Sequence, residues 1–160
     1  MKYLYCLLLA GLAASSAWAQ TDFSGKWVIS ESRIDWGMAP HWILSAGFNI
    51  KQDTSQITIE RRLLDQQMVE HPYTAELNFD CSPTQTPTLS NGTRKESLKW
   101  SDDKKTFVIT ASSVGSDGAP GPAVTETWSL LDGGKTLLDE RHVEQSNGMT
   151  YTSKAYYDRN

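Results

Sequence analysis

Asp22-Phe23-Ser24-Gly25-Lys26-Trp27-Val28-Ile29 is the stretch that decides the fold class. In an extended chain, Phe23, Trp27 and Ile29 fall on one face, because successive side chains of a β-strand point to opposite sides. Later segments of the chain repeat this alternation, and clusters of turn residues separate them. The sequence therefore predicts an all-β domain.

The first 19 residues have the features of a removable signal peptide. Lys2 supplies the positive charge, residues 4–12 form a short apolar run, and Ala17-Trp18-Ala19 fits the small-x-small cleavage rule. The apolar run is too short to span a membrane. We therefore expect one mature domain, residues 20–160, that is secreted or periplasmic.

Composition argues against several classes of partner. The chain of 160 residues has a net charge of −4, and loss of Lys2 would make it more negative still. A nucleic-acid partner would require a basic face, which this acidic balance does not favour. The sequence also contains no basic amphipathic helix of the kind that binds membrane surfaces. Only Cys81 remains beyond the leader, so an internal disulfide is not expected and stability must come from packing.

The alternation predicts about eight to nine strands joined by mostly short turns. The expected strand regions are 25–31, 48–52, 56–63, 68–79, 94–100, 106–112, 124–130, 136–145 and 149–158. Residues 81–93 contain two prolines and Asn-Gly and predict a loop, whereas Pro72 predicts a bulge or a strand end. Consecutive hairpins favour an antiparallel up-and-down meander, and closure into a barrel removes exposed edges. A β-sandwich is the alternative.

The long connection from Ser32 to Gly47 lacks strand alternation and carries Trp36, His41 and Trp42. Long ordered connections often cover a site. These aromatic side chains either stack on a flat or apolar ligand at a cavity mouth or plug one barrel end as a small satellite core. The sequence leaves both interpretations open.

Phe23-Ser24-Gly25-Lys26-Trp27 resembles the Gly-x-Trp motif that opens the lipocalin and calycin barrels. The resemblance implies a lipocalin-like barrel whose tryptophan closes one end, with residues 32–47 as a lid over the other. In that family a late arginine packs across the tryptophan, and Arg141 is the best match here. The turn Asp132-Gly133-Gly134-Lys135 is similar to turns of bacterial envelope proteins of the lipocalin-like type, but the chain has no Thr-Asp-Tyr motif in its middle.

Alternation also places ionisable side chains among inward-facing apolar ones: Arg61, His71, Glu126, Asp139 and Arg141. Charges inside a barrel are costly unless they are paired or hydrated. They either pair with one another, Arg141 with Asp139 or Glu126, or lie at the barrel ends. Alternatively, they orient a polar group of a ligand in an aromatic cavity.

The candidate ligand-binding residues combine these ionisable groups with aromatic side chains. They are Trp36, His41, Trp42, Arg61, His71, Tyr73, Trp100, Glu126, Trp128 and Tyr151. Trp100 and Trp128 fit a core role as well. The three histidines lack the spacing of metal ligands, so we expect neither a metal nor another cofactor.

Three functions fit this pattern. The first is a binding protein for a small apolar or amphipathic molecule, with Arg61 or Glu126 fixing a polar end and with no obligate protein partner. The second is a cavity enzyme of the isomerase, cyclase or lyase type, with Glu126 or His71 as base and Arg61 as anion stabiliser; it predicts a perturbed pKa in the cavity. The third is a structural protein with a filled core. We favour the first, and the sequence does not decide whether the protein catalyses a reaction.

Overall fold

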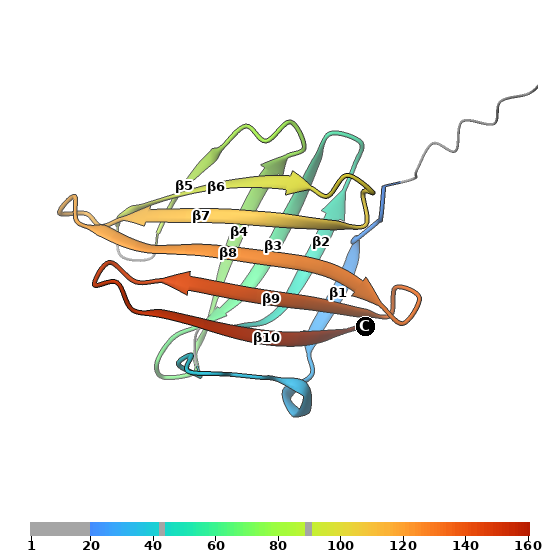
Figure 1. The fold of residues 1–160 in the computed structure, drawn as a ribbon, viewed down its shortest axis with the longest axis horizontal. Coiled ribbons are helices and arrows are strands. Elements are labelled where there is room, and N and C mark those ends of the chain that lie inside the picture. The colour runs from blue at the N-terminus through green and yellow to red at the C-terminus, as the bar shows by residue number, and fades with distance from the viewer. Residues whose placement is uncertain (1–19, 42–43, 89–90) are drawn as a thin grey trace, which may run out of the picture.

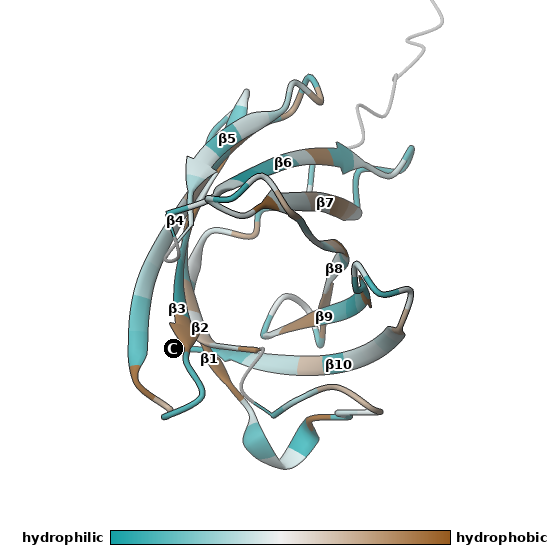
Figure 2. Ribbon diagram, turned by 90° about the vertical axis from the view of Figure 1, so that its left-hand side faces the viewer, coloured by the Kyte–Doolittle hydropathy of each residue, from teal (hydrophilic) through white to brown (hydrophobic). Residues whose placement is uncertain are grey.

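A computed structural model describes residues 20–41, 44–88 and 91–160. These residues form one antiparallel sheet of ten strands with the order β4-β3-β2-β1-β10-β9-β8-β7-β6-β5. The sheet curls into a nearly closed barrel, seen from the side in Figure 1 and along its axis in Figure 2. The predicted all-β meander is confirmed, and a single curled sheet replaces the alternative of a sandwich.

The elements follow one another with short turns except after β1. They are β1 (Gly25–Ile29), the 3-10 turn η1 (Glu31–Arg33), β2 (Ser45–Gln52), β3 (Gln56–Leu64), β4 (Glu70–Asn78), β5 (Thr84–Pro87), β6 (Thr93–Trp100), β7 (Thr106–Val114), β8 (Pro120–Leu131), β9 (Thr136–Glu144) and β10 (Thr150–Arg159). Among the described residues, none of the helical turns is long or apolar enough to cross a lipid bilayer. The expected signal peptide, residues 1–19, lies outside the described residues and stays a prediction.

The expected count of eight to nine strands was too low, because the stretch 81–93 contains β5. The four residues of β5 are polar or proline and none of them is buried, so no apolar alternation marks this strand. Such a composition suits a sheet edge, where short polar strands discourage pairing with other chains. Pro72 lies in β4, the edge strand at the other end of the sheet, where proline is tolerated.

The two edge strands face each other across a strand gap, defined here as the space between β4 and the β5–β6 pair. No ladder of backbone hydrogen bonds joins β4 to β5 in the described sheet. Side chains bridge the gap instead: the Tyr73 hydroxyl lies 2.7 Å from Thr86 Oγ1 and donates to Glu96 Oε2 at 2.5 Å. The Tyr73 side chain thus links β4 to both β5 and β6 across the strand gap.

Trp27 closes one end of the barrel, as the resemblance implied. Its indole is 1% exposed, and Nε1 donates to the Phe23 carbonyl at 3.0 Å. The arginine that covers this ring is Arg159, whose guanidinium carbon lies 4.6 Å from the ring centroid. The assignment of this role to Arg141 was wrong, because β10 pairs with β1 so that Arg159 stands opposite Trp27, whereas Arg141 lies on β9.

An aromatic core fills the barrel above Trp27. Phe23, Phe107 and Trp100 pack against one another, and Phe48 packs between Trp128 and Tyr157, with ring centroids 4.5–5.9 Å apart. Edge-to-face and tilted contacts at these distances favour a rigid layer. The other end of the barrel, called the open end, carries the turns at residues 65–69, 115–119 and 145–149.

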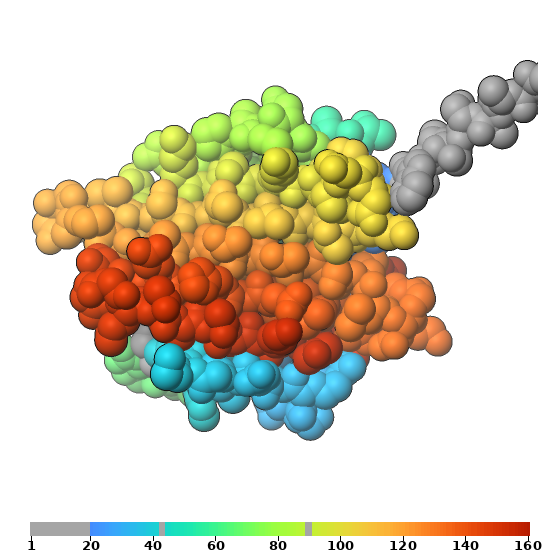
Figure 3. Space-filling model, in the orientation of Figure 1, coloured from blue at the N-terminus to red at the C-terminus, as the bar shows by residue number. Residues whose placement is uncertain are grey.

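After β1, the described part of the long connection runs beside β10 (Figure 3). Asp35 and Lys154 exchange two backbone hydrogen bonds of 2.8–2.9 Å, so the segment continues the line of β1. Trp36 packs against the core cluster and stacks on His41, with ring centroids 4.4 Å apart. This placement of Trp36 fits the satellite-core interpretation, whereas Trp42 lies outside the described residues and a lid role stays a prediction.

Candidate functional site

A cavity of about 550 Å³ lies between the aromatic core and the turns of the open end. This volume falls within the range of small-molecule sites, roughly 300–1,000 Å³. Its lining comes from β3, β4, β6, β8, β9, β10 and the adjoining turns: Arg61, Leu63, Leu64, Asp65, Gln66, Tyr73, Thr88, Arg94, Pro122, Val124, Glu126, Arg141, Val143, Gln145 and Tyr151. Apolar and aromatic side chains thus share the wall with a few charged ones.

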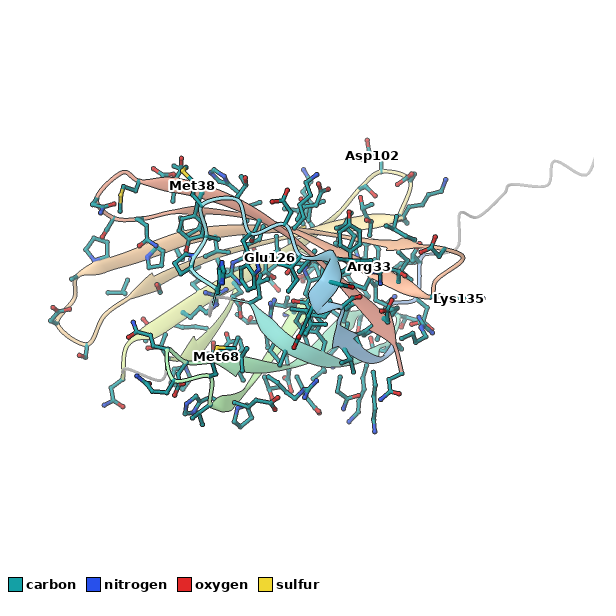
Figure 4. The ribbon with its side chains drawn as sticks, turned by 90° about the horizontal axis from the view of Figure 1, so that it is seen from below. Arg33, Met38, Met68, Asp102, Glu126 and Lys135 are labelled. Atoms are coloured by element: carbon teal, nitrogen blue, oxygen red, sulfur yellow. The ribbon has the colours of Figure 1, made fainter. Side chains whose placement is uncertain are left out.

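The floor of the cavity is an ion pair between opposite walls of the barrel. Arg61 on β3 meets Glu126 on β8 through two hydrogen bonds, Nη1 to Oε1 at 3.1 Å and Nη2 to Oε2 at 2.7 Å. Arg61 is 4% exposed and Glu126 is 1% exposed. The guanidinium of Arg61 rests on the core, with its carbon 5.6 Å from the Phe48 ring and 5.3 Å from the Trp128 ring. Figure 4 shows Glu126 in the interior between the strands.

Glu126 has a second cationic partner. This partner is Arg141 on β9, whose Nη1 lies 3.3 Å from Glu126 Oε1. Burial by itself would raise the pKa of Glu126, but the charges of Arg61 and Arg141 hold it down at about 2. A carboxylate that is always ionised and bound by two guanidiniums is a poor proton acceptor at neutral pH.

Asp139 lies beneath this floor and behaves in the opposite way. It is 2% exposed and does not line the cavity. Burial, together with the negative charge of Glu126, raises the pKa of Asp139 to about 8. The buried hydroxyl of Tyr157, which has no hydrogen-bond partner among the described residues, shares this environment, and burial raises its pKa further above 10. Asp139 is therefore a neutral acid at pH 7.

A second polar cluster lies beside the strand gap. Glu96 on β6 is 1% exposed; it accepts from Nε of Arg94 at 2.9 Å and from the Tyr73 hydroxyl. Burial and the charge of Glu96 raise the pKa of Tyr73 to about 12. Sequence reasoning missed Arg94 and Glu96, although they alternate in phase with the buried Leu98. The same rule of period two would have found both.

The structure brings four of the predicted site residues together at the cavity: Arg61, Tyr73, Glu126 and Tyr151. The others lie elsewhere. Trp100 and Trp128 belong to the core. Trp36 and His41 do not line the cavity, and Trp42 lies outside the described residues.

His71 points to the open end rather than to the floor. Its Nε2 lies 2.9 Å from Asp65 Oδ2, its side chain is 37% exposed, and it does not line the cavity. Within residues 20–41, 44–88 and 91–160, no three His, Cys, Asp or Glu side chains gather as metal ligands would. A binding role for each of the predicted residues stays a prediction.

Comparisons with known proteins concern the fold. No family model and no curated protein matches this sequence. The structure is similar to zebrafish ileal bile acid-binding protein solved with cholic acid, at 12% identity and a TM-score of 0.57, over 86% of this chain and 98% of that one. It is also similar to a variant of the fluorescent protein UnaG, at 12% identity and a TM-score of 0.51, over 86% and 95%. At this identity the likeness shows the fold alone, which is a nearly closed antiparallel β-barrel.

Proposed function

We propose that this protein binds one small, largely apolar molecule in the barrel cavity. The observation that carries the proposal is an open volume of about 550 Å³ above an aromatic core. Leu63, Val124, Val143 and the rings of Tyr73 and Tyr151 supply an apolar wall, and the charged groups are confined to its floor and rim. A structural protein with a filled core would have no use for this volume.

Binding without turnover is favoured over catalysis by the state of the candidate bases. Glu126 is fixed by two arginines and has a depressed pKa, so it does not accept a proton readily. His71 lies outside the cavity lining and pairs with Asp65. Asp139, whose pKa is raised, is sealed beneath the floor where no substrate atom reaches it. Glu126 thus lacks a suitable pKa, and neither His71 nor Asp139 lines the cavity.

Two further considerations support the proposal, one on ligand binding and one on location outside the cytoplasm. The bile acid-binding protein with a similar fold was solved with the small amphipathic molecule cholic acid. The leader sequence of residues 1–19 fits export, so the proposed ligand would be one found in the cell envelope or its surroundings.

Native mass spectrometry of the protein purified from its own cells tests the proposal. We expect a reproducible excess of mass over the denatured chain. The variant Val124→Trp, which fills the cavity, should lose this excess, whereas Ala123→Trp on the exposed face of the same strand should keep it. A bare mass in the wild type, together with no mass gained from a panel of apolar compounds, would refute the proposal.

A further inference from the structure

We propose that the ligand of this cavity carries a negatively charged group and that Arg94 is the residue that binds it. The inference rests on the proposed binding function and names the chemical class of the ligand. It concerns an arginine that sequence reasoning did not single out. Carboxylates, sulfonates and phosphate esters share the chemistry in question.

The buried charges at the floor of the cavity and beside the strand gap do not balance. Three guanidiniums line the cavity, those of Arg61, Arg94 and Arg141. Two buried carboxylates form ion pairs with them. Glu126 pairs with both Arg61 and Arg141, and Glu96 pairs with Arg94. Positive charge therefore exceeds negative charge by one across this cluster, and an uncompensated charge in a partly desolvated site is costly.

A third carboxylate, Asp65, lines the cavity at its open end, and the total charge of the three arginines, Glu96, Glu126 and Asp65 is therefore zero. The carboxylate of Asp65 accepts hydrogen bonds from His71 and from the backbone amides of Gln67 and Val69 at the exposed rim, so the excess of positive charge is local to the buried cluster. The chain as a whole is acidic, with a net charge of −4. A buried cluster with one positive charge in excess favours an anion over a cation as its partner.

Arg94 is the guanidinium with donors to spare. Its Nε binds Glu96, and neither of its Nη nitrogens has a hydrogen bond within the described residues. Its side chain is 19% exposed and lines the cavity. Both Nη nitrogens of Arg61, by contrast, are occupied by Glu126. Arg94 therefore presents a fork of N–H donors, the geometry that binds planar and tetrahedral anions in two-point fashion.

The position of Arg94 also keeps its fork in place. Glu96 holds the Nε end, and the Tyr73 hydroxyl in turn fixes Glu96 across the strand gap. An anion that binds the Nη end completes the solvation of a guanidinium that is already oriented. A neutral apolar ligand would cover the same donors without satisfying them, which carries the usual cost of unpaired buried polar groups.

A matched pair of fluorescent probes tests the inference. 1-Anilinonaphthalene-8-sulfonate and N-phenyl-1-naphthylamine share one aromatic body, but only the first carries a negative charge. We expect Arg94→Gln to raise the Kd of the sulfonate by about 10- to 100-fold, the value of one charge-assisted contact, and to change the Kd of the amine less than twofold. Lys95→Gln, on the exposed face of the same strand, removes one positive charge and should change neither Kd.

Each outcome bears on a different claim. Equal affinity of the wild type for both probes, or an unchanged sulfonate Kd in Arg94→Gln, would overturn the role of Arg94 while leaving cavity binding intact. Probe binding that Val124→Trp does not reduce would instead refute the cavity as the binding site. If Arg94→Gln does not fold, Arg94→Lys replaces it, with an intermediate sulfonate Kd expected and a Kd equal to that of the wild type counting against the two-point contact.

Discussion

Replacing Asp139 by asparagine should stabilise the protein in mildly alkaline solution and leave its stability nearly unchanged at pH 4. Burial, reinforced by the charge of Glu126, raises the pKa of Asp139 to about 8 from its ordinary 3.8. Between these two values the unfolded chain has released the proton that the folded chain retains. The free energy of unfolding contributed by Asp139 is therefore complete below pH 3.8 and is lost progressively as the pH rises towards 8.

The size of the effect follows from the pKa difference. At 1.36 kcal/mol for each unit, a rise of about four units corresponds to an upper limit of about 6 kcal/mol above pH 8. Arg141 and Arg61 lie near enough to lower the pKa of Asp139, so the cluster can relax around an ionised carboxylate. We therefore expect Asp139→Asn to gain on the order of 3 kcal/mol at pH 8.5 and less than about 1 kcal/mol at pH 4.5.

Urea unfolding followed by tryptophan fluorescence at several values between pH 4.5 and 8.5 measures the difference. Asp102→Asn is the matched control, because it removes the same charge from an exposed turn between β6 and β7 (Figure 4). The free energy of unfolding of Asp102→Asn should follow that of the wild type at every pH. That of Asp139→Asn should exceed the wild-type value by a growing margin as the pH rises. Parallel curves for the wild type and Asp139→Asn over the whole range would refute the assignment of a neutral acid at this position.

Three further substitutions test other contacts. Glu126→Gln leaves the buried guanidinium of Arg61 without its counter-charge and should cost roughly 3–5 kcal/mol in urea unfolding; a cost under 1 kcal/mol would show that the pair is dispensable. Arg159→Met removes the cation over Trp27 and should cost about 1 kcal/mol in thermal unfolding; an unchanged midpoint would contradict this contact. Tyr73→Phe removes both hydrogen bonds across the strand gap and should speed amide exchange in β4 but not in β2; equal exchange in both proteins would argue against the bridge.

Alternation alone was enough to predict which side chains face inward. Arg61, Glu126, Asp139 and Arg141 all proved to face the interior. The rule held because a strand has a period of two and because the irregularities of register, at Ser45–Phe48 and at Ser112–Val114, lie outside these stretches.

Partner choice could not be predicted in the same way. Arg61 and Glu126 are 65 residues apart and lie on β3 and β8, which are not neighbours in the sheet. Alternation gives the face of a residue but not its height along the barrel axis, so it cannot say which inward charges meet. The arginine over Trp27 escaped prediction for a related reason, since only the β1–β10 register brings Arg159 to that ring.

The charged layer between core and cavity is not explained by stability. A buried ion pair replaced by well-packed apolar side chains is often as stable or more so, and Asp139 lowers stability at neutral pH. What the layer does achieve is rigidity, since Arg61 is tied at two points to Glu126 and rests on the rings beneath it. Side chains held in this way do not collapse into the volume above them. Local departures from stability of this kind are expected where a protein keeps a site ready for a ligand, and here they coincide with the floor of the proposed ligand cavity, which Arg94 also lines.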